Sequence, residues 1–244
     1  MNEPLSGRRI AFFGGSFDPP HLGHLAIARA AREALALDTV LFAPVGTQPL
    51  KPRGSTAEFA HRVAMTRLAI GEEAGFALSL ADAPQPSGAP NYTLETLFKL
   101  RAGLPPMGEL FCLMGADSFA LLRRWHRAAE IPFAAALVVA SRPGESLEDL
   151  EAALPAGLTM ERIAGRDLNL GEIQIHRYIL RNSAGAQAPF YLLPNLEIEI
   201  SASAIREQLR GDAQAVRLED ALLPAPVLKY IRTHDLYHNL PRPD

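Results

Sequence analysis

The sequence contains very little cysteine. Cys112 is the single cysteine among 244 residues, so no internal disulfide can form. It lies in the apolar run Leu110–Met114, which predicts a buried structural thiol rather than a catalytic one. One cysteine also fits a reducing compartment. The sequence therefore excludes a disulfide-stabilised scaffold, and we expect a cytoplasmic protein.

Long hydrophobic runs are also absent. A membrane-spanning helix needs about 20 consecutive apolar residues, and no segment approaches that length. The first apolar run, Ile10–Phe13, is cut off by two glycines and is too short for the core of a signal peptide. We therefore expect a soluble protein without a membrane partner.

Positive charge is not in excess. The chain has 24 Lys and Arg against 27 Asp and Glu, for a formal net charge of −3. A broad nucleic-acid surface normally requires a basic excess, so we expect no nucleic-acid partner. A polyanionic ligand would have to be held by a few locally placed groups. Apolar residues make up 48% of the chain, which is ample for a globular core.

Short apolar runs alternate with segments of helical periodicity. The runs expected to form buried strands are Ile10–Phe13, Val40–Ala43, Phe76–Leu80, Leu110–Met114 and Ala135–Ala140. Helical spacing begins at Leu22, Phe59, Leu94 and Phe119, and the last of these helices is expected to include Leu122 and Trp125. This alternation predicts an open, doubly wound α/β fold with a mainly parallel sheet.

We expect one domain over residues 1–244, with a helical C-terminal part from about residue 201. Residues 145–190 are the least informative part of the chain. They contain one predicted helix, around Leu147, Leu150 and Leu154, and then a mixed segment from Leu168 to Arg181 that matches neither periodicity.

A first candidate site follows the first predicted strand, where open parallel sheets bind ligands. The sequence there is Gly14-Gly15-Ser16-Phe17-Asp18-Pro19-Pro20-His21-Leu22-Gly23-His24. The glycines let the backbone approach a ligand, and Asp18 before two prolines predicts a capped helix start. His21 and His24 would share a face of the first helical turn, where unpaired N–H groups attract phosphate.

Other phosphate and metal motifs do not match this segment. No Gly-Lys-Ser/Thr follows the glycines, as a P-loop requires, and the dinucleotide fingerprint is missing. No Glu or Cys joins His21 and His24 at metal-ligand spacing, so we predict no metal bound by the protein itself. A metal-dependent hydrolase that uses the two histidines stays as an alternative.

A second candidate site is Ser201-Ala202-Ser203-Ala204-Ile205-Arg206, which follows a predicted strand at 198–200. Its serines suit a helix N-terminus, and Arg206 can hold phosphate oxygens with two bonds. By itself this is a common helix start. Together with the first motif it predicts a second anion-binding helix terminus.

With both motifs present, the chain resembles the nucleotidyltransferase superfamily that carries the His-x-Gly-His signature. It is more closely similar to the bacterial nicotinate-nucleotide adenylyltransferases, over nearly its whole length. The resemblance also includes Arg62–Met65, Tyr92–Leu97, Met114–Ser118, Trp125, Ser141–Gly144 and Tyr230–Tyr237. It implies a Rossmann-like architecture and transfer of AMP from ATP, with its Mg²⁺, to nicotinate mononucleotide. The products would be deamido-NAD and pyrophosphate, in NAD biosynthesis.

The resemblance also implies a role for individual residues. The catalytic residues would be His21, His24 and Arg206. The residues that bind ATP would be Gly14, Gly15, Ser16, Phe17, His21, His24, Gly115, Asp117, Ser203 and Arg206. The residues that bind nicotinate mononucleotide would be Ser16, Lys51, Tyr92, Thr93, Trp125 and His126. Trp125 would stack on the pyridine ring, and backbone N–H groups near Thr93 and His126 would bind its carboxylate.

Each of three roles has a structural alternative. In these alternatives, Trp125 packs in the core instead of stacking on the pyridine ring. Asp117 caps a helix that begins near Ser118, and Lys51 is a solvated charge on a loop. The chain also departs from the family pattern at three positions: Leu50 replaces a histidine, Ala202 replaces a serine, and His126 stands where tyrosine is common.

Two further functions remain as alternatives. One is the same reaction on nicotinamide mononucleotide or phosphopantetheine. The other is a non-catalytic sensor of adenine nucleotides, which would be expected to lose a histidine or the arginine. The sequence does not determine the oligomeric state, and a homo-oligomer is one of the alternatives.

Overall fold

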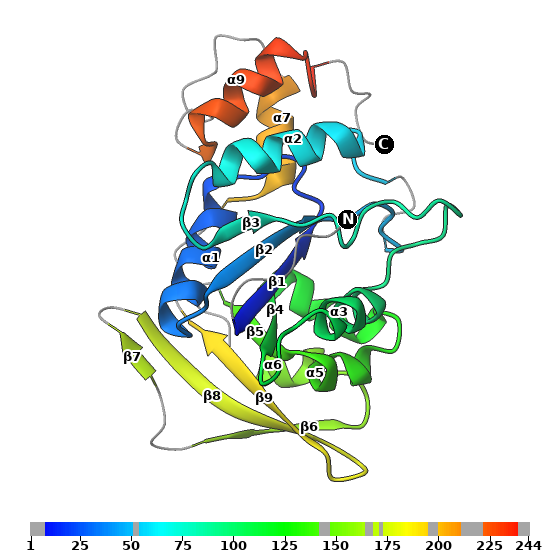
Figure 1. Ribbon diagram of the computed structural model, residues 1–244, viewed down its shortest axis with the longest axis vertical. Coiled ribbons are helices and arrows are strands. Elements are labelled where there is room, and N and C mark those ends of the chain that lie inside the picture. The colour runs from blue at the N-terminus through cyan, green and yellow to red at the C-terminus, as the bar shows by residue number, and fades with distance from the viewer. Residues whose placement is uncertain are drawn as a thin grey trace.

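Parallel strands form the centre of the fold, as the alternating pattern predicts. In the computed structural model they are β1 (Arg9–Gly15), β2 (Thr39–Pro44), β3 (Phe76–Leu78), β4 (Glu109–Gly115) and β5 (Ala136–Ala140). They lie in the order β3-β2-β1-β4-β5, and every neighbouring pair is parallel (Figure 1). Phe111, Cys112 and Leu113 of β4 are each 1% exposed, because helices cover both faces of the sheet. The predicted buried thiol is confirmed.

The structure describes residues 8–50, 54–141, 147–163, 168–170, 173–194, 200–210 and 222–238. Lys51, residues 142–144 and most of the strand expected at 198–200 lie outside these ranges, so what the sequence predicts for them stays a prediction. Within the described ranges, no helix has the length and apolar character needed to cross a bilayer.

The part of the chain around the segment Leu168–Arg181, which matched neither periodicity, extends the sheet at one edge. That segment contains β7 (Leu168–Leu170) and most of β8 (Ile173–Asn182), and β6 (Leu158–Arg162) and β9 (Gln187–Leu193) flank it. β9 pairs in parallel with β5, whereas β8 pairs antiparallel with β9, β6 and β7. The sheet is therefore mainly parallel, with an antiparallel extension (Figure 1).

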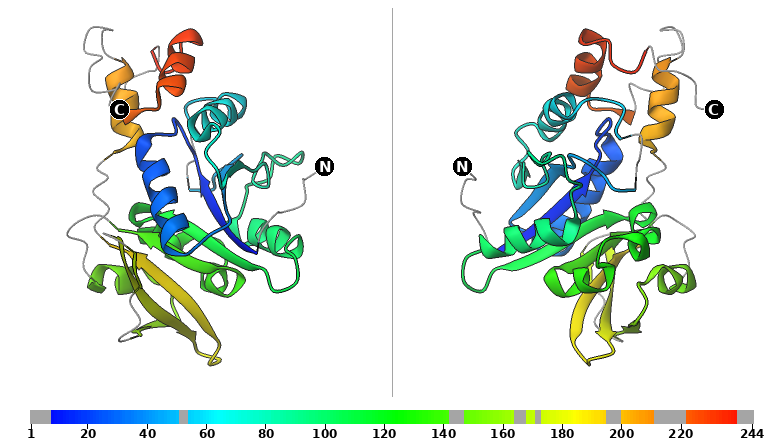
Figure 2. Two further views of the ribbon diagram at one scale, coloured as in Figure 1. Left: turned by 60° about the vertical axis from the view of Figure 1, so that its left-hand side comes forward. Right: turned by 90° about the vertical axis from the view of Figure 1, so that its right-hand side faces the viewer.

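Helices cover both faces of the sheet and one end of it. They are α1 (Leu22–Ala34), α2 (Phe59–Ile70), α3 (Thr93–Ala102), α4 (Ala116–Ala120), α5 (Ile131–Ala134), α6 (Leu147–Ala153), α7 (Ala202–Arg210) and α9 (Ala225–Thr233). The helix α1 packs on one face, and α3 to α6 pack on the other. A third apolar cluster joins α2, α7 and α9 at one end of the molecule (Figures 1 and 2). The helical C-terminal part thus begins at Ala202, and one domain over 1–244 stays a prediction.

Two predicted elements differ from the structure. The strand β3 stops at Leu78, because the Ser79 hydroxyl accepts the N–H of Ala81 in a turn, and Leu80 is 52% exposed. The prediction of a helix that includes Trp125 is also wrong. The helix α4 ends at Ala120, and the 3₁₀ turns η1 (Leu122–Arg124) and η2 (Ala128–Glu130) follow it.

The reason for the shorter α4 is the tighter hydrogen bonding after it. The N–H of Leu121 bonds to the carbonyl of Ser118, and that of Trp125 bonds to Leu122. These three-residue steps bury Leu122 completely and leave Trp125 in an extended conformation at the end of the turn.

Candidate active site

A pocket of about 620 Å³ lies at the carboxyl ends of β1 and β4. This is the edge at which open α/β sheets bind ligands. Every predicted site residue that the structure describes lines it: Gly14, Gly15, Ser16, Phe17, His21, His24, Tyr92, Thr93, Gly115, Asp117, Trp125, His126, Ser203 and Arg206. Lys51 is the one member of the predicted set outside the described residues. One pocket therefore brings both sequence motifs together.

The loop after β1 differs from the prediction at Asp18. His21, not Asp18, is the N-cap residue of α1, since the prolines separate Asp18 from the helix start. The Asp18 carboxylate instead accepts the N–H groups of Thr56, at 2.5 Å, and Ala57, at 3.0 Å. It also accepts the hydroxyl of Tyr237 at 2.8 Å. Asp18 thus anchors the first motif to the loop before α2 and to the C-terminal part.

The two histidines lie against each other at the start of α1. Their ring centroids are 3.7 Å apart, and His24 Nδ1 accepts the backbone N–H of His21 at 3.2 Å. The proton of a neutral His24 is therefore on Nε2, where it can be donated to a ligand. His21 Nδ1 is buried, and no partner for it occurs among the described residues. Such an orphaned polar atom suits a site that binds a polar ligand.

Burial keeps both imidazoles neutral near pH 7. It lowers the pKa of His21 to about 4, although Asp117 acts in the opposite direction. It also holds the pKa of His24 well below the usual 6.5, and His21 adds to this effect. A polyphosphate in the pocket would raise both pKa values, because negative charge stabilises the imidazolium.

Arg206 reaches the first motif from α7. Its Nη1 donates to the carbonyl oxygen of Asp18 at 2.6 Å, and its Nη2 donates to Ser203 Oγ at 3.1 Å. Two of its five N–H donors are used in this way. The helix α7 thus brings a permanent positive charge to the pocket that the two histidines line.

The end of β4 forms another wall of the pocket. Gly115 is the N-cap residue of α4, and Asp117 lies in the first turn. Asp117 therefore does not cap this helix, and the helix begins at Ala116 rather than near Ser118. A Cβ atom on Gly115 would approach only Asp117 Oδ1, at 3.7 Å. The backbone here is open toward the pocket.

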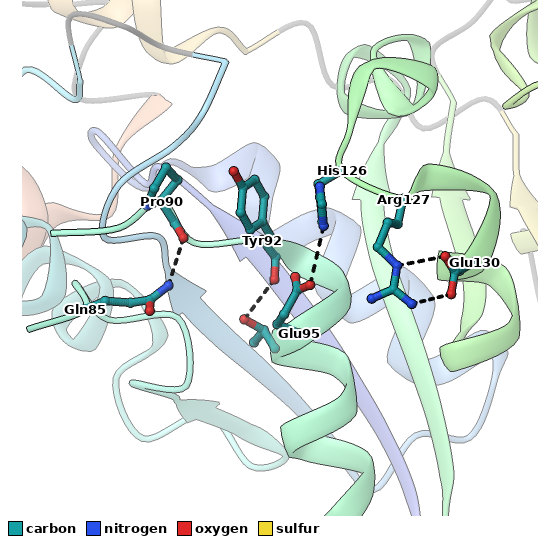
Figure 3. A network of polar contacts seen from close by, with 8 residues as sticks. Gln85, Pro90, Tyr92, Glu95, His126, Arg127 and Glu130 are labelled. Carbon is teal, nitrogen blue, oxygen red and sulfur yellow. Dashed lines mark hydrogen bonds and ion pairs between the residues drawn. The ribbon is translucent and has the colours of Figure 1, made fainter. Parts of the chain in front are cut away.

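Aromatic side chains also line the pocket. Trp125 is half-buried, and it both packs on the core cluster beside the sheet and lines the pocket. The rings of Tyr92 and His126 lie side by side, with centroids 4.3 Å apart (Figure 3). Thr93 is the first residue of α3, so unpaired N–H groups of a helix terminus face this region.

Arg62 has a structural role that the sequence alone did not indicate. This side chain of α2 is 2% exposed and donates to the carbonyl oxygens of Ser16 and Val45, each at 2.8 Å, and of Ala57 at 3.2 Å. Burial lowers its pKa, and the nearby Asp18 carboxylate opposes this effect. An arginine on an amphipathic helix is normally solvated, so only its place in the segment Arg62–Met65 marked it.

Asn91 orders the neighbouring loop and was also missed. Its Oδ1 accepts the N–H of Thr47, and its Nδ2 donates to the carbonyl of Ala83, each at 2.9 Å. These bonds hold the loop that carries Gln48, whose side-chain oxygen accepts the Ser16 hydroxyl at 3.0 Å. The signal available in the sequence was its position directly before Tyr92 and Thr93.

The part of the pocket at the start of α1 has the chemistry that an anion needs. It combines imidazole donors, a guanidinium and a helix N-terminus. Across the part of the chain that the structure describes, no three His, Cys, Asp or Glu side chains gather as metal ligands would.

Comparisons with known proteins identify the family of the chain. Residues 12–208 match the model of the cytidylyltransferase-like family. A protein of Gloeobacter violaceus named "Probable nicotinate-nucleotide adenylyltransferase" is 38% identical over 231 residues, which are 95% of this chain and 97% of that protein. A protein of Solibacter usitatus with the same name is 36% identical over 94% of this chain and 100% of its own length.

A solved structure shares the fold. The Plasmodium falciparum nicotinic acid mononucleotide adenylyltransferase complexed with NaAD superposes with a TM-score of 0.65. The match covers 94% of this chain and 97% of that one, at 16% identity. The doubly wound architecture predicted from the alternating pattern is confirmed.

Proposed function

Because the chain belongs to the cytidylyltransferase-like family, and within it to the nicotinate-nucleotide adenylyltransferases, we propose that it transfers AMP from ATP to nicotinate mononucleotide. The products are deamido-NAD and pyrophosphate, and the reaction is a step of NAD biosynthesis. The observation that carries this proposal is the pocket that unites His21, His24 and Arg206 with the aromatic wall of Tyr92 and Trp125.

The chemistry is a problem of positioning and charge. A phosphate oxygen of the mononucleotide attacks the α-phosphorus of ATP, and the bond from that phosphorus to the oxygen bridging to the β-phosphate breaks. The attacking phosphate is already an anion near pH 7, so the reaction needs no general base. The protein has to align two anions that repel each other and to stabilise the leaving pyrophosphate.

We assign the stabilisation of the phosphates to His21, His24 and Arg206. The His24 Nε2 proton is held in place by the bond from the His21 N–H to Nδ1, so this donor needs no rearrangement during the reaction. Arg206 adds a fixed positive charge, and Ser203 orients its guanidinium. ATP enters as its Mg²⁺ complex, and Mg²⁺ keeps several waters and needs few protein ligands.

The two ends of the pocket bind the two nucleotides in this proposal. Gly115 lets the adenosine approach the backbone, and Asp117 accepts its ribose hydroxyls. At the other end Trp125 stacks on the pyridine ring, and backbone N–H groups near Thr93 and His126 bind the ring carboxylate. The remaining contacts are those of Gly14, Gly15 and Phe17 with the ATP phosphates and those of Ser16, Lys51 and Tyr92 with the mononucleotide.

Release of pyrophosphate from MgATP by the purified protein tests the proposal. Nicotinate mononucleotide, nicotinamide mononucleotide, phosphopantetheine and no acceptor are compared. We expect strong release with nicotinate mononucleotide. Release only with another acceptor would keep the reaction and overturn the assigned acceptor. ATP binding without release under any condition would favour a nucleotide sensor.

A further inference from the structure

A polar cluster surrounds His126 at the acceptor end of the pocket. The imidazole lies beside the ring of Tyr92, and its Nε2 is 3.7 Å from Glu95 Oε1 on α3 (Figure 3). Both side chains are partly exposed, His126 at 43% and Glu95 at 40%. Tyr92 and His126 line the pocket itself. The imidazole can therefore interact with a ligand as well as with Glu95.

The charges around this imidazole are those of Glu95, Arg127, Glu130 and Arg124. Arg127 and Glu130 form a two-bond ion pair, with distances of 2.8 and 2.6 Å (Figure 3). Arg127 holds the pKa of Glu130 below its usual range, and His126 contributes to this. Arg124 of η1 also lines the pocket. Carboxylate and guanidinium side chains ordinarily keep their charges between about pH 5.5 and 8.5.

His126 is the member of this cluster whose residue type changes charge in that range. Glu95, Glu130, Arg127 and Arg124 together carry no net charge. A neutral imidazole therefore leaves this cluster without net charge. An imidazolium makes the cluster positive, which attracts a carboxylate, and the face of Tyr92 also favours a cation. A neutral amide on the pyridine ring would feel much less of this difference.

We propose that the His126 side chain determines specificity, because its imidazolium attracts the ring carboxylate of the acceptor and makes the preference for acid over amide depend on pH. This inference rests on the proposed function. It assigns the charge of the side chain a role that is separate from the backbone N–H groups at the same position.

The ratio of two specificity constants isolates this effect. kcat/KM is measured for nicotinate mononucleotide and for nicotinamide mononucleotide with saturating MgATP, from about pH 5.5 to about pH 8.5. Ionisation of His21, of His24 and of the acceptor phosphate affects both acceptors and cancels in the ratio. We expect the acid-to-amide ratio to fall about three- to fivefold as pH rises, the effect of one partly exposed ion pair.

Two variants of His126 and one matched control complete the experiment. His126→Phe keeps a ring beside Tyr92, and His126→Gln keeps a donor toward Glu95, but neither can be charged. Both should give a ratio that does not change with pH. His176→Phe, on β8 and away from the pocket lining, should keep the pH dependence. The acid-to-amide ratio should fall with the same pH midpoint as the change in the NMR chemical shift of the His126 ring.

Each outcome decides the proposal. A ratio that is flat in the unmodified protein, or that still varies with pH in both His126 variants, overturns the inference and leaves the proposed function intact. Failure to turn over either acceptor overturns the proposed function and the inference together. A fall in the ratio that disappears in both variants supports the inference.

Discussion

The hydrogen bond from the His21 N–H to His24 Nδ1 fixes the side of the imidazole that faces a ligand. His24→Ala removes the Nε2 donor and should lower kcat about 100-fold or more, with a smaller change in ATP affinity. His24→Gln replaces it with an amide donor and should recover part of the loss. Steady-state kinetics and ATP titration check this. Equal losses in kcat and affinity would mean that the contact binds substrate and transition state alike.

The buried state of His21 makes stability depend on pH. Its pKa is about 4 in the folded protein and near 6.5 when unfolded, so the unfolded chain binds more protons between these values. This residue therefore has no effect above about pH 6.5, and it lowers the unfolding free energy by about 1.4 kcal/mol per pH unit as the pH falls from about 6.5 to about 4. Urea unfolding at several pH values should show that His21→Asn loses less unfolding free energy than the unmodified protein as the pH falls. If both proteins lose it equally steeply, this prediction is contradicted.

Gly115 provides a test of the end of the pocket that we propose for adenosine. Its backbone conformation, φ −78°, suits any residue, and an added Cβ would meet only Asp117 Oδ1 at 3.7 Å. Gly115→Ala should therefore leave the melting temperature nearly unchanged while raising KM for ATP about tenfold, since the methyl group occupies the place of the ligand. If ATP binds Gly115→Ala normally, adenosine does not approach this backbone.

The helix α2 illustrates how one element orders a site that it does not enter. Arg62 bonds to carbonyls of three segments around the pocket. Arg62→Met leaves these buried oxygens without donors and should cost about 3 kcal/mol or more of unfolding free energy, measured with urea. Arg67→Met, at an exposed position of the same helix, should change it by less than about 0.5 kcal/mol. Similar effects of the two changes would refute the assigned role.

Elements with a strong local signal were predictable from the sequence. The apolar runs of β1, β2, β4 and β5 are continuous because both sides of these strands are buried. The hairpin of β8 and β9 was not predictable, since its pairing depends on an edge that β5 provides. The role of Asp18 was missed for a related reason. Its partners are 38 to 219 residues away, and local capping rules cannot detect them.

At the scale of the whole molecule, the C-terminal part is tied to the first motif. The Tyr237 hydroxyl bonds to Asp18 from within the cluster of α2, α7 and α9. Burial raises the pKa of Tyr237, and Asp18 adds to this, so the hydroxyl stays a donor. Tyr237→Phe should cost about 1 to 2 kcal/mol in thermal unfolding and also reduce kcat.

Tyr230→Phe is the matched control for that prediction. It removes a hydroxyl on α9 that contacts His61 rather than Asp18. We expect a small loss of stability and normal turnover. A normal kcat in Tyr237→Phe would show that the C-terminal part stabilises the fold without positioning the loop after β1.

The central place of β1 has a consequence for synthesis on the ribosome. β1 pairs with β2 soon after it emerges, but its other edge waits for β4, about 95 residues later. At roughly 5–20 residues per second this edge stays open for about 5 to 20 seconds. An open apolar edge can pair with another chain. The nascent protein therefore passes through an interval in which protection by a chaperone matters, and Arg206 joins the two histidines only after β5 and β9 have also been made.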